Sequence, residues 1–130
     1  MNLKKLIDLA NSLADDLIPD EEVKEFVNDA IAAINIEVGA NFPSLENMDD
    51  EPVFPEKWQR MLIVPYAKAR IKEKDSSQFE WAVAYEQFFE NLLLFKTNYH
   101  IPDEYKDENS QGTISERSLV ENRPFIWGGW

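Results

Sequence analysis

Hydrophobic side chains recur every three to four positions over most of the chain, a pattern that predicts amphipathic α-helices. The first helix is expected over residues 3–18, ending before Pro19 because the residue before a proline avoids the helical region. The second should begin in the run PDEEV, whose acidic side chains complement the helix dipole, and should end at Gly39. The alternation in INIEVG leaves open whether its last turn is helical or extended. The expected apolar faces are Leu3, Leu6, Ile7, Ala10, Leu13, Ala14, Leu17 and Ile18 in the first helix, and Val23, Phe26, Val27, Ala30, Ile31 and Ile34 in the second.

Two further helices are expected after a long acidic loop over residues 40–55. The third, over about residues 56–74, has apolar side chains on two sides, which indicates a central position in the bundle. Pro65 lies inside this helix and is expected to kink it. The fourth helix begins at a capping box that opens with Ser77 and runs to about Asn98.

The fourth helix carries more large apolar side chains than one small bundle needs. Its main apolar positions are Trp81, Ala82, Tyr85, Phe88, Phe89, Leu92, Leu93 and Phe95. Val83 and Leu94 stand on its other side, among the polar residues Glu80, Gln87, Glu90 and Asn91. Either the core is crowded and these two are incidental, or the excess marks a contact with another subunit. We take Val83 and Leu94 as candidate subunit-interface residues.

At 130 residues the chain is long enough for one hydrophobic core. The sequence therefore predicts an all-α protein, with a bundle of about four helices over residues 1–101 and a long extended C-terminal arm over residues 102–130. The arm is polar until its last nine residues, NRPFIWGGW. Tryptophan and arginine are enriched at binding hot spots, so this end is a candidate for partner binding. The candidate residues are Arg123, Pro124, Phe125, Ile126, Trp127 and Trp130. Three alternatives stay open for the arm. It could dock on another subunit or partner, it could fold back on its own bundle, or it could be a tail without a fixed position.

The charge is strongly negative and unevenly distributed. The net charge is −12; residues 1–56 contain 14 acidic and 3 basic side chains, whereas residues 57–74 contain 6 basic and 1 acidic. Such a charge repels phosphates, so sequence-specific binding to duplex DNA is not expected. The basic side chains of residues 57–74 are scattered around their helix and form no stripe. Ion pairing with the acidic helices or with a neighbouring subunit is their expected use.

The residue types give little support for an enzyme. The absence of cysteine excludes disulfides, zinc thiolate sites and thiol nucleophiles. The only histidine, His100, stands at a predicted helix end, where interaction with the helix dipole is its expected role. The alternative, a metal site with Asp103 and Glu104, would have a single nitrogen ligand. We therefore predict no catalytic residues, no metal and no cofactor. No apolar run approaches the length of a membrane span, so no membrane association is expected.

The assembled pattern resembles the head–tail connector proteins of tailed bacteriophages, also called head-completion or adaptor proteins. The resemblance rests on the opening helices LKKLIDLANSLADDLIPDEEVKEFVNDAIAAIN, on FPEKWQRMLIVPYAKARIKEK after a proline-rich loop, on the aromatic SSQFEWAVAYEQFFENLLLFKTNY and on the polar arm. The resemblance covers about residues 3–99 as a sequence pattern. For the arm, it extends only to the presence of an arm of this type. The 29-residue arm, which ends in two tryptophans, departs from a minimal connector.

This resemblance implies a structural virion protein that forms a homo-oligomeric ring, a dodecamer matching the twelve-fold portal. The ring would join the head to the tail and extend the DNA channel, with the portal and the next tail-side protein as partners and DNA passing without specific binding. Its place would be the head–tail interface of the virion, and the host cytoplasm during assembly. Carried to this chain, Phe125, Ile126, Trp127 and Trp130 would grip the portal or a neighbour. The acidic first helices, or Glu46, Asp49, Asp50 and Glu51 of the loop, would line the channel.

Three other functions stay open. A soluble helical adaptor or regulator would bind one protein partner through the aromatic peptide at the C-terminal end, and would be a monomer in which only that peptide matters. An acidic DNA mimic would block a DNA-binding enzyme and would need carboxylates spaced like phosphates. The third alternative is an enzyme. A ring instead predicts Val83, Leu94 and the arm at subunit boundaries.

Overall fold

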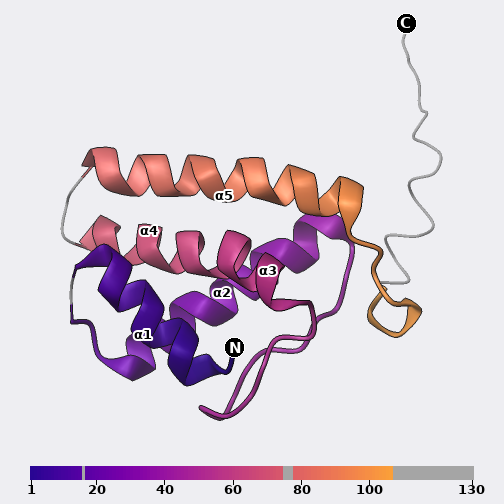
Figure 1. Cartoon of the computed structure of the whole chain (residues 1–130), viewed down its shortest axis with the longest axis horizontal. Coiled ribbons are helices and arrows are strands. Elements are labelled where there is room, and N and C mark those ends of the chain that lie inside the picture. The colour runs from indigo at the N-terminus through magenta and orange to yellow at the C-terminus, as the bar shows by residue number, and fades with distance from the viewer. Residues whose placement is uncertain (16, 75–77, 107–130) are drawn as a thin grey trace, which may run out of the picture.

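The computed structural model describes residues 1–15, 17–74 and 78–106, and over these residues the prediction of an all-α bundle of four helices is confirmed (Figure 1). The helices are α1 (Leu3–Ala14), α2 (Asp20–Val38), a third helix in three continuous segments, α3 (Glu56–Trp58), η1 (Gln59–Ile63) and α4 (Val64–Lys74), and α5 (Gln78–Asn98). A short 3₁₀ turn, η2 (Asp103–Tyr105), follows. This part of the chain has no strand, only a single antiparallel bridge between Ala40 and Lys106. Most of the predicted arm, residues 107–130, lies outside the described residues.

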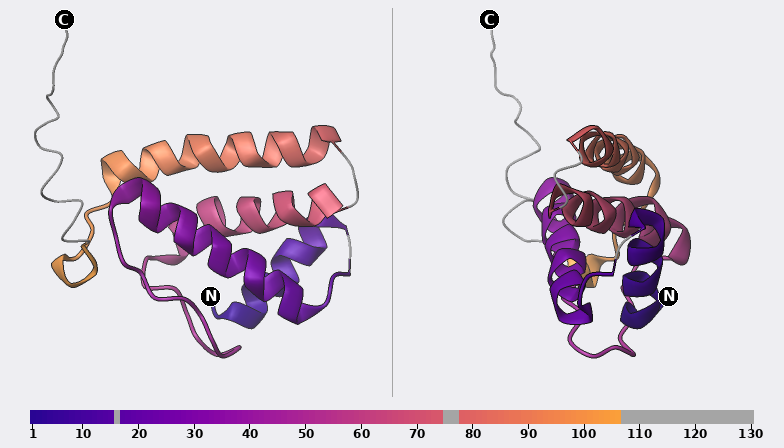
Figure 2. Two further views of the ribbon diagram at one scale, coloured as in Figure 1. Left: turned by 180° about the vertical axis from the view of Figure 1, so that it is seen from behind. Right: turned by 90° about the vertical axis from the view of Figure 1, so that its left-hand side faces the viewer.

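The helices form layers with α4 in the middle (Figures 1 and 2). On one side α4 packs against α5, and on the other it packs against α1 and α2, which also contact each other. The central position predicted for the third helix is therefore confirmed. Helix α5 packs mainly on α4 and η1, so one side of this long helix faces away from the bundle. None of the described helices combines the length and the apolar character that a membrane crossing requires.

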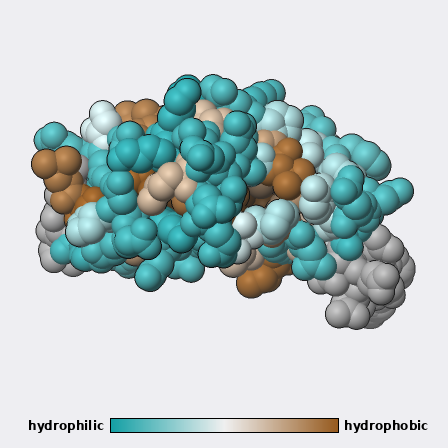
Figure 3. All heavy atoms as spheres, turned by 90° about the horizontal axis from the view of Figure 1, so that it is seen from below, coloured by the Kyte–Doolittle hydropathy of each residue, from teal (hydrophilic) through white to brown (hydrophobic). Residues whose placement is uncertain are grey.

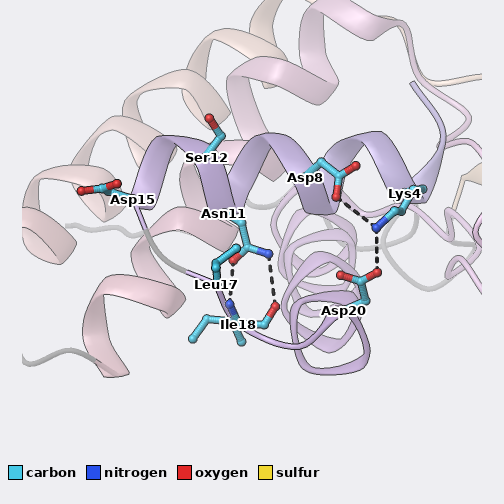
Figure 4. Close-up of a pocket in the computed structure, with 8 residues that line it drawn as sticks. All are labelled: Lys4, Asp8, Asn11, Ser12, Asp15, Leu17, Ile18 and Asp20. Carbon is cyan, nitrogen blue, oxygen red and sulfur yellow. Dashed lines mark hydrogen bonds and ion pairs between the residues drawn. The ribbon is translucent and has the colours of Figure 1, made fainter.

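Helix α1 is shorter than the predicted span of residues 3–18. It ends at Ala14 because Asp15 adopts the left-handed conformation, with φ 56°. The side chain of Asn11 accepts a hydrogen bond from the Ile18 amide and donates one to the Ile18 carbonyl, each 3.2 Å long (Figure 4). These two bonds fold the connection back against the helix. Two side chains expected on the apolar face are exposed instead, Leu13 and Leu17.

Helix α2 matches its prediction closely. It begins at Asp20 and stays helical to Val38, which decides between the helical and extended alternatives for its last turn. Gly39 ends it with φ 70°, a conformation that glycine adopts without steric cost. All six predicted apolar positions are buried, namely Val23, Phe26, Val27, Ala30, Ile31 and Ile34.

Pro65, at which we predicted a kink, follows the π-helix η1, which ends at Ile63, two residues before it. In this segment the Val64 amide donates to the carbonyl of Gln59, five residues back. Proline has no amide hydrogen, so the carbonyl of Met61 loses its usual donor four residues ahead. Asn91 of α5 supplies the missing donor, because its Nδ2 lies 2.8 Å from the Met61 carbonyl oxygen. Asn91, which we had assigned to the polar outer side of the helix, is therefore part-buried against η1.

Replacing Asn91 with alanine is expected to lower the free energy of unfolding by about 1–3 kcal/mol, because a part-buried carbonyl loses the side-chain donor that replaces the missing proline amide. Urea denaturation measures this loss. Asn98→Ala is the matched control, since the exposed Asn98 side chain donates only within its own helix, to the Leu94 carbonyl at 2.9 Å and to the Thr97 hydroxyl at 3.2 Å. The control should change stability by less than about 0.5 kcal/mol. Equal losses in the two variants would contradict the role given to Asn91.

The long acidic loop over residues 40–55 packs against α2 and the start of α1 (Figure 1). Its apolar side chains Phe42, Leu45 and Phe54 are buried. Asn28 of α2 forms two hydrogen bonds with the backbone of Leu45, of 2.7 and 2.9 Å, and Asn35 forms two with the backbone of Phe42, of 2.9 and 3.0 Å. Helix α2 thus holds the loop in place by the same type of asparagine pair that Asn11 makes with Ile18.

Residues 102–106, which we had assigned to the arm, pack on the bundle. The ring of Tyr105 lies 5.7 Å from that of Phe42, and the Asn41 amide donates to the Tyr105 carbonyl at 2.6 Å. Lys106 pairs with Ala40 in the single bridge. The part of the chain that is held by the bundle therefore extends five residues beyond the predicted boundary at residue 101.

Candidate functional site

The candidate site is the side of α5 that faces away from α4, which we call the α5 outer face. It consists of Ala82, Val83, Glu86, Phe89, Glu90, Leu93 and Leu94, all of them exposed. The exposed fractions of its large apolar side chains are 61% for Val83, 60% for Phe89, 63% for Leu93 and 47% for Leu94. Neighbouring large apolar side chains that remain in water on one helix are typical of an interaction surface.

The helical period of 3.6 residues per turn divides the α5 outer face into three rows along the helix axis. One apolar row contains Ala82, Phe89 and Leu93. A second contains Val83 and Leu94, which lie about three turns apart, and an acidic row of Glu86 and Glu90 runs between the two. A shallow hollow follows the first and middle rows and reaches Val83 and the half-buried Tyr85. The surface therefore offers apolar contact on both sides of two carboxylates.

The opposite side of α5 belongs to the core. Phe88 and Phe95 are fully buried, with the Phe88 ring 5.1 Å from that of Tyr66 and the Phe95 ring 5.2 Å from that of Trp58. Three of the main apolar positions named for this helix, Ala82, Phe89 and Leu93, are instead exposed. The apolar excess of this helix is thus not a crowded core. Val83 is joined by Phe89 and Leu93 on one surface, and its role as a subunit contact stays a prediction.

Tyr85 marks the edge between the two sides of α5. Burial, together with the nearby Glu73 carboxylate, raises the pKa of Tyr85 to about 12. The phenol is therefore protonated at neutral pH, and its hydroxyl donates to Glu73 Oε1 over 3.4 Å. The edge of the α5 outer face gains no charge from this residue.

The proposed channel-lining acids lie in the loop beside the start of α1. Glu46, Asp49 and Glu51 are exposed, whereas Asp50 is only partly so. The Asp50 carboxylate accepts hydrogen bonds from the amides of Asn47 and Glu46, both 2.9 Å long, and its carbonyl accepts one from the Leu3 amide at 2.8 Å. Asp50 therefore closes the loop onto α1, and this role in the fold explains the residue without a channel.

The hydrogen bonds to Asp50 predict a dependence of stability on acidity. The amides of Asn47 and Glu46 lower the pKa of Asp50, so the carboxylate is favoured in the folded state. Its stabilising contribution is present above the unfolded pKa of about 3.9 and is lost as the pH falls through the lower folded pKa. We expect Asp50→Asn to destabilise the protein more at pH 7 than at a pH below the folded pKa of Asp50. Urea denaturation at the two pH values measures the difference. A pH-independent loss would contradict this account.

Two basic side chains of α4, Arg70 and Lys74, form ion pairs with α2, as expected. Arg70 lies 3.0 Å from Asp29 Oδ2 and over the ring of Phe26, 4.7 Å from its centroid. Lys74 pairs with Glu22 one turn further along. These cations hold the two helices together, and no basic stripe for a nucleic acid is formed by them.

A polar hollow lies beside α1 (Figure 4). Lys4 at its rim is paired with Asp8 and Asp20, at 3.2 and 2.8 Å, and Asn11 is satisfied by the backbone of Ile18. Figure 3 shows the face of the molecule opposite α5, on which hydrophilic side chains predominate.

No three potential metal-binding side chains come together in residues 1–15, 17–74 and 78–106. His100 is exposed just after α5 and belongs to no such group.

The six candidate residues of the arm, from Arg123 to Trp130, lie outside the described residues. Comparison of the chain with protein families, with curated proteins and with solved structures found no match.

Proposed function

We propose that the chain is a head–tail connector protein of a tailed bacteriophage, a structural virion protein whose copies form a ring beneath the portal. The ring would join the head to the tail and extend the DNA channel. The observation that supports this function best is the α5 outer face, on which Val83, Phe89, Leu93 and Leu94 are left exposed by the part of the chain that the structure describes. A ring is built by repeating a contact between two different surfaces of the same subunit, and this face is suited to be one of them.

The size of the face fits assembly on a template. Fully burying a large apolar side chain contributes about 1.5–3 kcal/mol, and these four already have part of their surface covered, so one contact would contribute roughly 4–6 kcal/mol. Association costs at least about 4 kcal/mol in lost freedom of motion. The contact would therefore be weak between free subunits and would become stable when a portal holds many of them together.

The charge of the chain fits the passage of DNA. With a net charge of −12, each subunit repels phosphates, and a ring of such subunits would let DNA slide without adhering. Glu46, Asp49 and Glu51 are exposed and suited to face such a channel. Asp50 is less suited, because its carboxylate is bound to two amides of its own loop.

Adding the purified protein to DNA-filled heads that carry a portal but lack this chain tests the function. We expect the protein to sediment with these heads and to be absent from heads without a portal. A soluble adaptor would instead form a one-to-one complex with one protein through residues 122–130 and would ignore the heads. Failure to bind portal-bearing heads would overturn the proposed function.

A further inference from the structure

We propose that in the free protein residues 122–130 of the same chain dock on the α5 outer face. The aromatic side chains of the segment would cover the two apolar rows, and Arg123 would lie against Glu86 and Glu90. This inference does not depend on the ring, because it concerns the isolated subunit.

The chemistry of the two surfaces is complementary. The α5 outer face has apolar rows on both sides of two carboxylates, and it contains no basic side chain. The segment NRPFIWGGW has four large apolar side chains, one arginine and no acidic side chain. The residues that lead to it, DENSQGTISERSLVE, are mostly polar and offer no comparable apolar group. The segment is thus the part of residues 107–130 that matches the face in both polarity and charge.

The connecting chain is long enough. The last described residue, Lys106, is held against Ala40 at the end of α2. From there, residues 107–121 can span up to about 50 Å when extended. Helix α5, with 21 residues, is about 31 Å long. The segment can therefore reach any part of the face without a change in the bundle.

Docking within one chain is favoured over docking between copies in dilute solution. A short tether gives the attached segment an effective concentration in the millimolar range, far above that of a second copy at micromolar protein. Covering the face in this way keeps its apolar side chains from water. In a ring, where the same face would meet a neighbouring subunit, the segment would have to leave it.

Nuclear magnetic resonance of the full chain tests the docking. We expect nuclear Overhauser effects between the indole protons of Trp127 or Trp130 and the methyl groups of Val83, Leu93 or Leu94. They should persist at the same relative intensity after about tenfold dilution, because an intramolecular contact does not depend on concentration. They should be absent between labelled and unlabelled copies in a mixed sample. Contacts seen between copies, or no contact of the indoles with α5, would overturn the inference.

Two sets of variants of the full chain sharpen this test. Replacing both tryptophans, Trp127→Ala and Trp130→Ala, should shift the methyl resonances of the α5 outer face and leave those of the exposed Ile36 on α2 unchanged. Arg123→Glu should weaken the contacts, and combining it with Glu86→Lys and Glu90→Lys should restore them. Unchanged α5 resonances in the double alanine variant would contradict docking. Because no portal is present, the outcome is separate from that of the head-binding experiment.

Discussion

Replacing Phe88 with alanine is expected to lower the free energy of unfolding by about 3–5 kcal/mol. Phe88 is fully buried on the inner side of α5, and its ring packs edge-on against Tyr66 at 5.1 Å. Removing it leaves a cavity between α5 and α4 that the surrounding core fills only in part. Urea denaturation followed by circular dichroism measures the loss.

The adjacent residue provides a matched control. Phe89 has the same side chain on the same helix but is 60% exposed, so Phe89→Ala should cost less than about 1 kcal/mol. The pair therefore reports which side of α5 faces the core. Equal losses, or a larger loss for Phe89, would mean that α5 is rotated about its axis and that the α5 outer face is wrongly assigned.

Replacing Val83 and Leu94 together with glutamate is expected to reduce binding to portal-bearing heads by about 100-fold or more, since each buried apolar side chain contributes about 1.5–3 kcal/mol and the new carboxylates add repulsion. Glutamate is a good helix former, and both positions are exposed, so the fold should be unaffected. Sedimentation of the variant with the heads measures the loss.

Ile36→Glu is the control for this experiment. Ile36 is 83% exposed on α2 and lies outside the α5 outer face, so the same change of charge there should leave binding within about twofold of the unmodified protein. Full binding by the double variant would remove Val83 and Leu94 from the subunit interface. A comparable loss with Ile36→Glu would show that added charge alone is responsible.

Hydrophobic periodicity and helix-ending residues predicted most of the fold. The six buried positions of α2 follow a clear helical period, and Gly39 ends the helix as expected. The early end of α1 was not predictable in this way, because it depends on Asn11 binding the backbone of Ile18 seven residues ahead. Asn28 and Asn35 bind the loop in the same manner. Such pairs form only when two segments are already close, and an isolated asparagine has no local feature that distinguishes it.

The orientation of α5 shows a different limit of the sequence. More than half of its circumference is apolar, so periodicity alone does not distinguish the buried Phe88 from the exposed Phe89. The orientation of α5 is set by its packing on α4 and η1 and by the hydrogen bond from the Asn91 side chain to the Met61 carbonyl. One signal was present in the sequence: Glu86 and Glu90 stand one turn apart between two apolar rows, and two such carboxylates would be costly to bury. The partner of that surface depends on residues 107–130 or on other chains.

The ring beneath the portal is the central claim, and cryo-electron microscopy of complete tailed particles tests it most directly. The particles would come from cells that express this chain together with its genomic neighbours. We expect a ring of this chain directly beneath the portal, with the α5 outer face of each subunit buried against the next. Absence of the chain from the head–tail interface, or its presence there as a single copy, would contradict the proposed function.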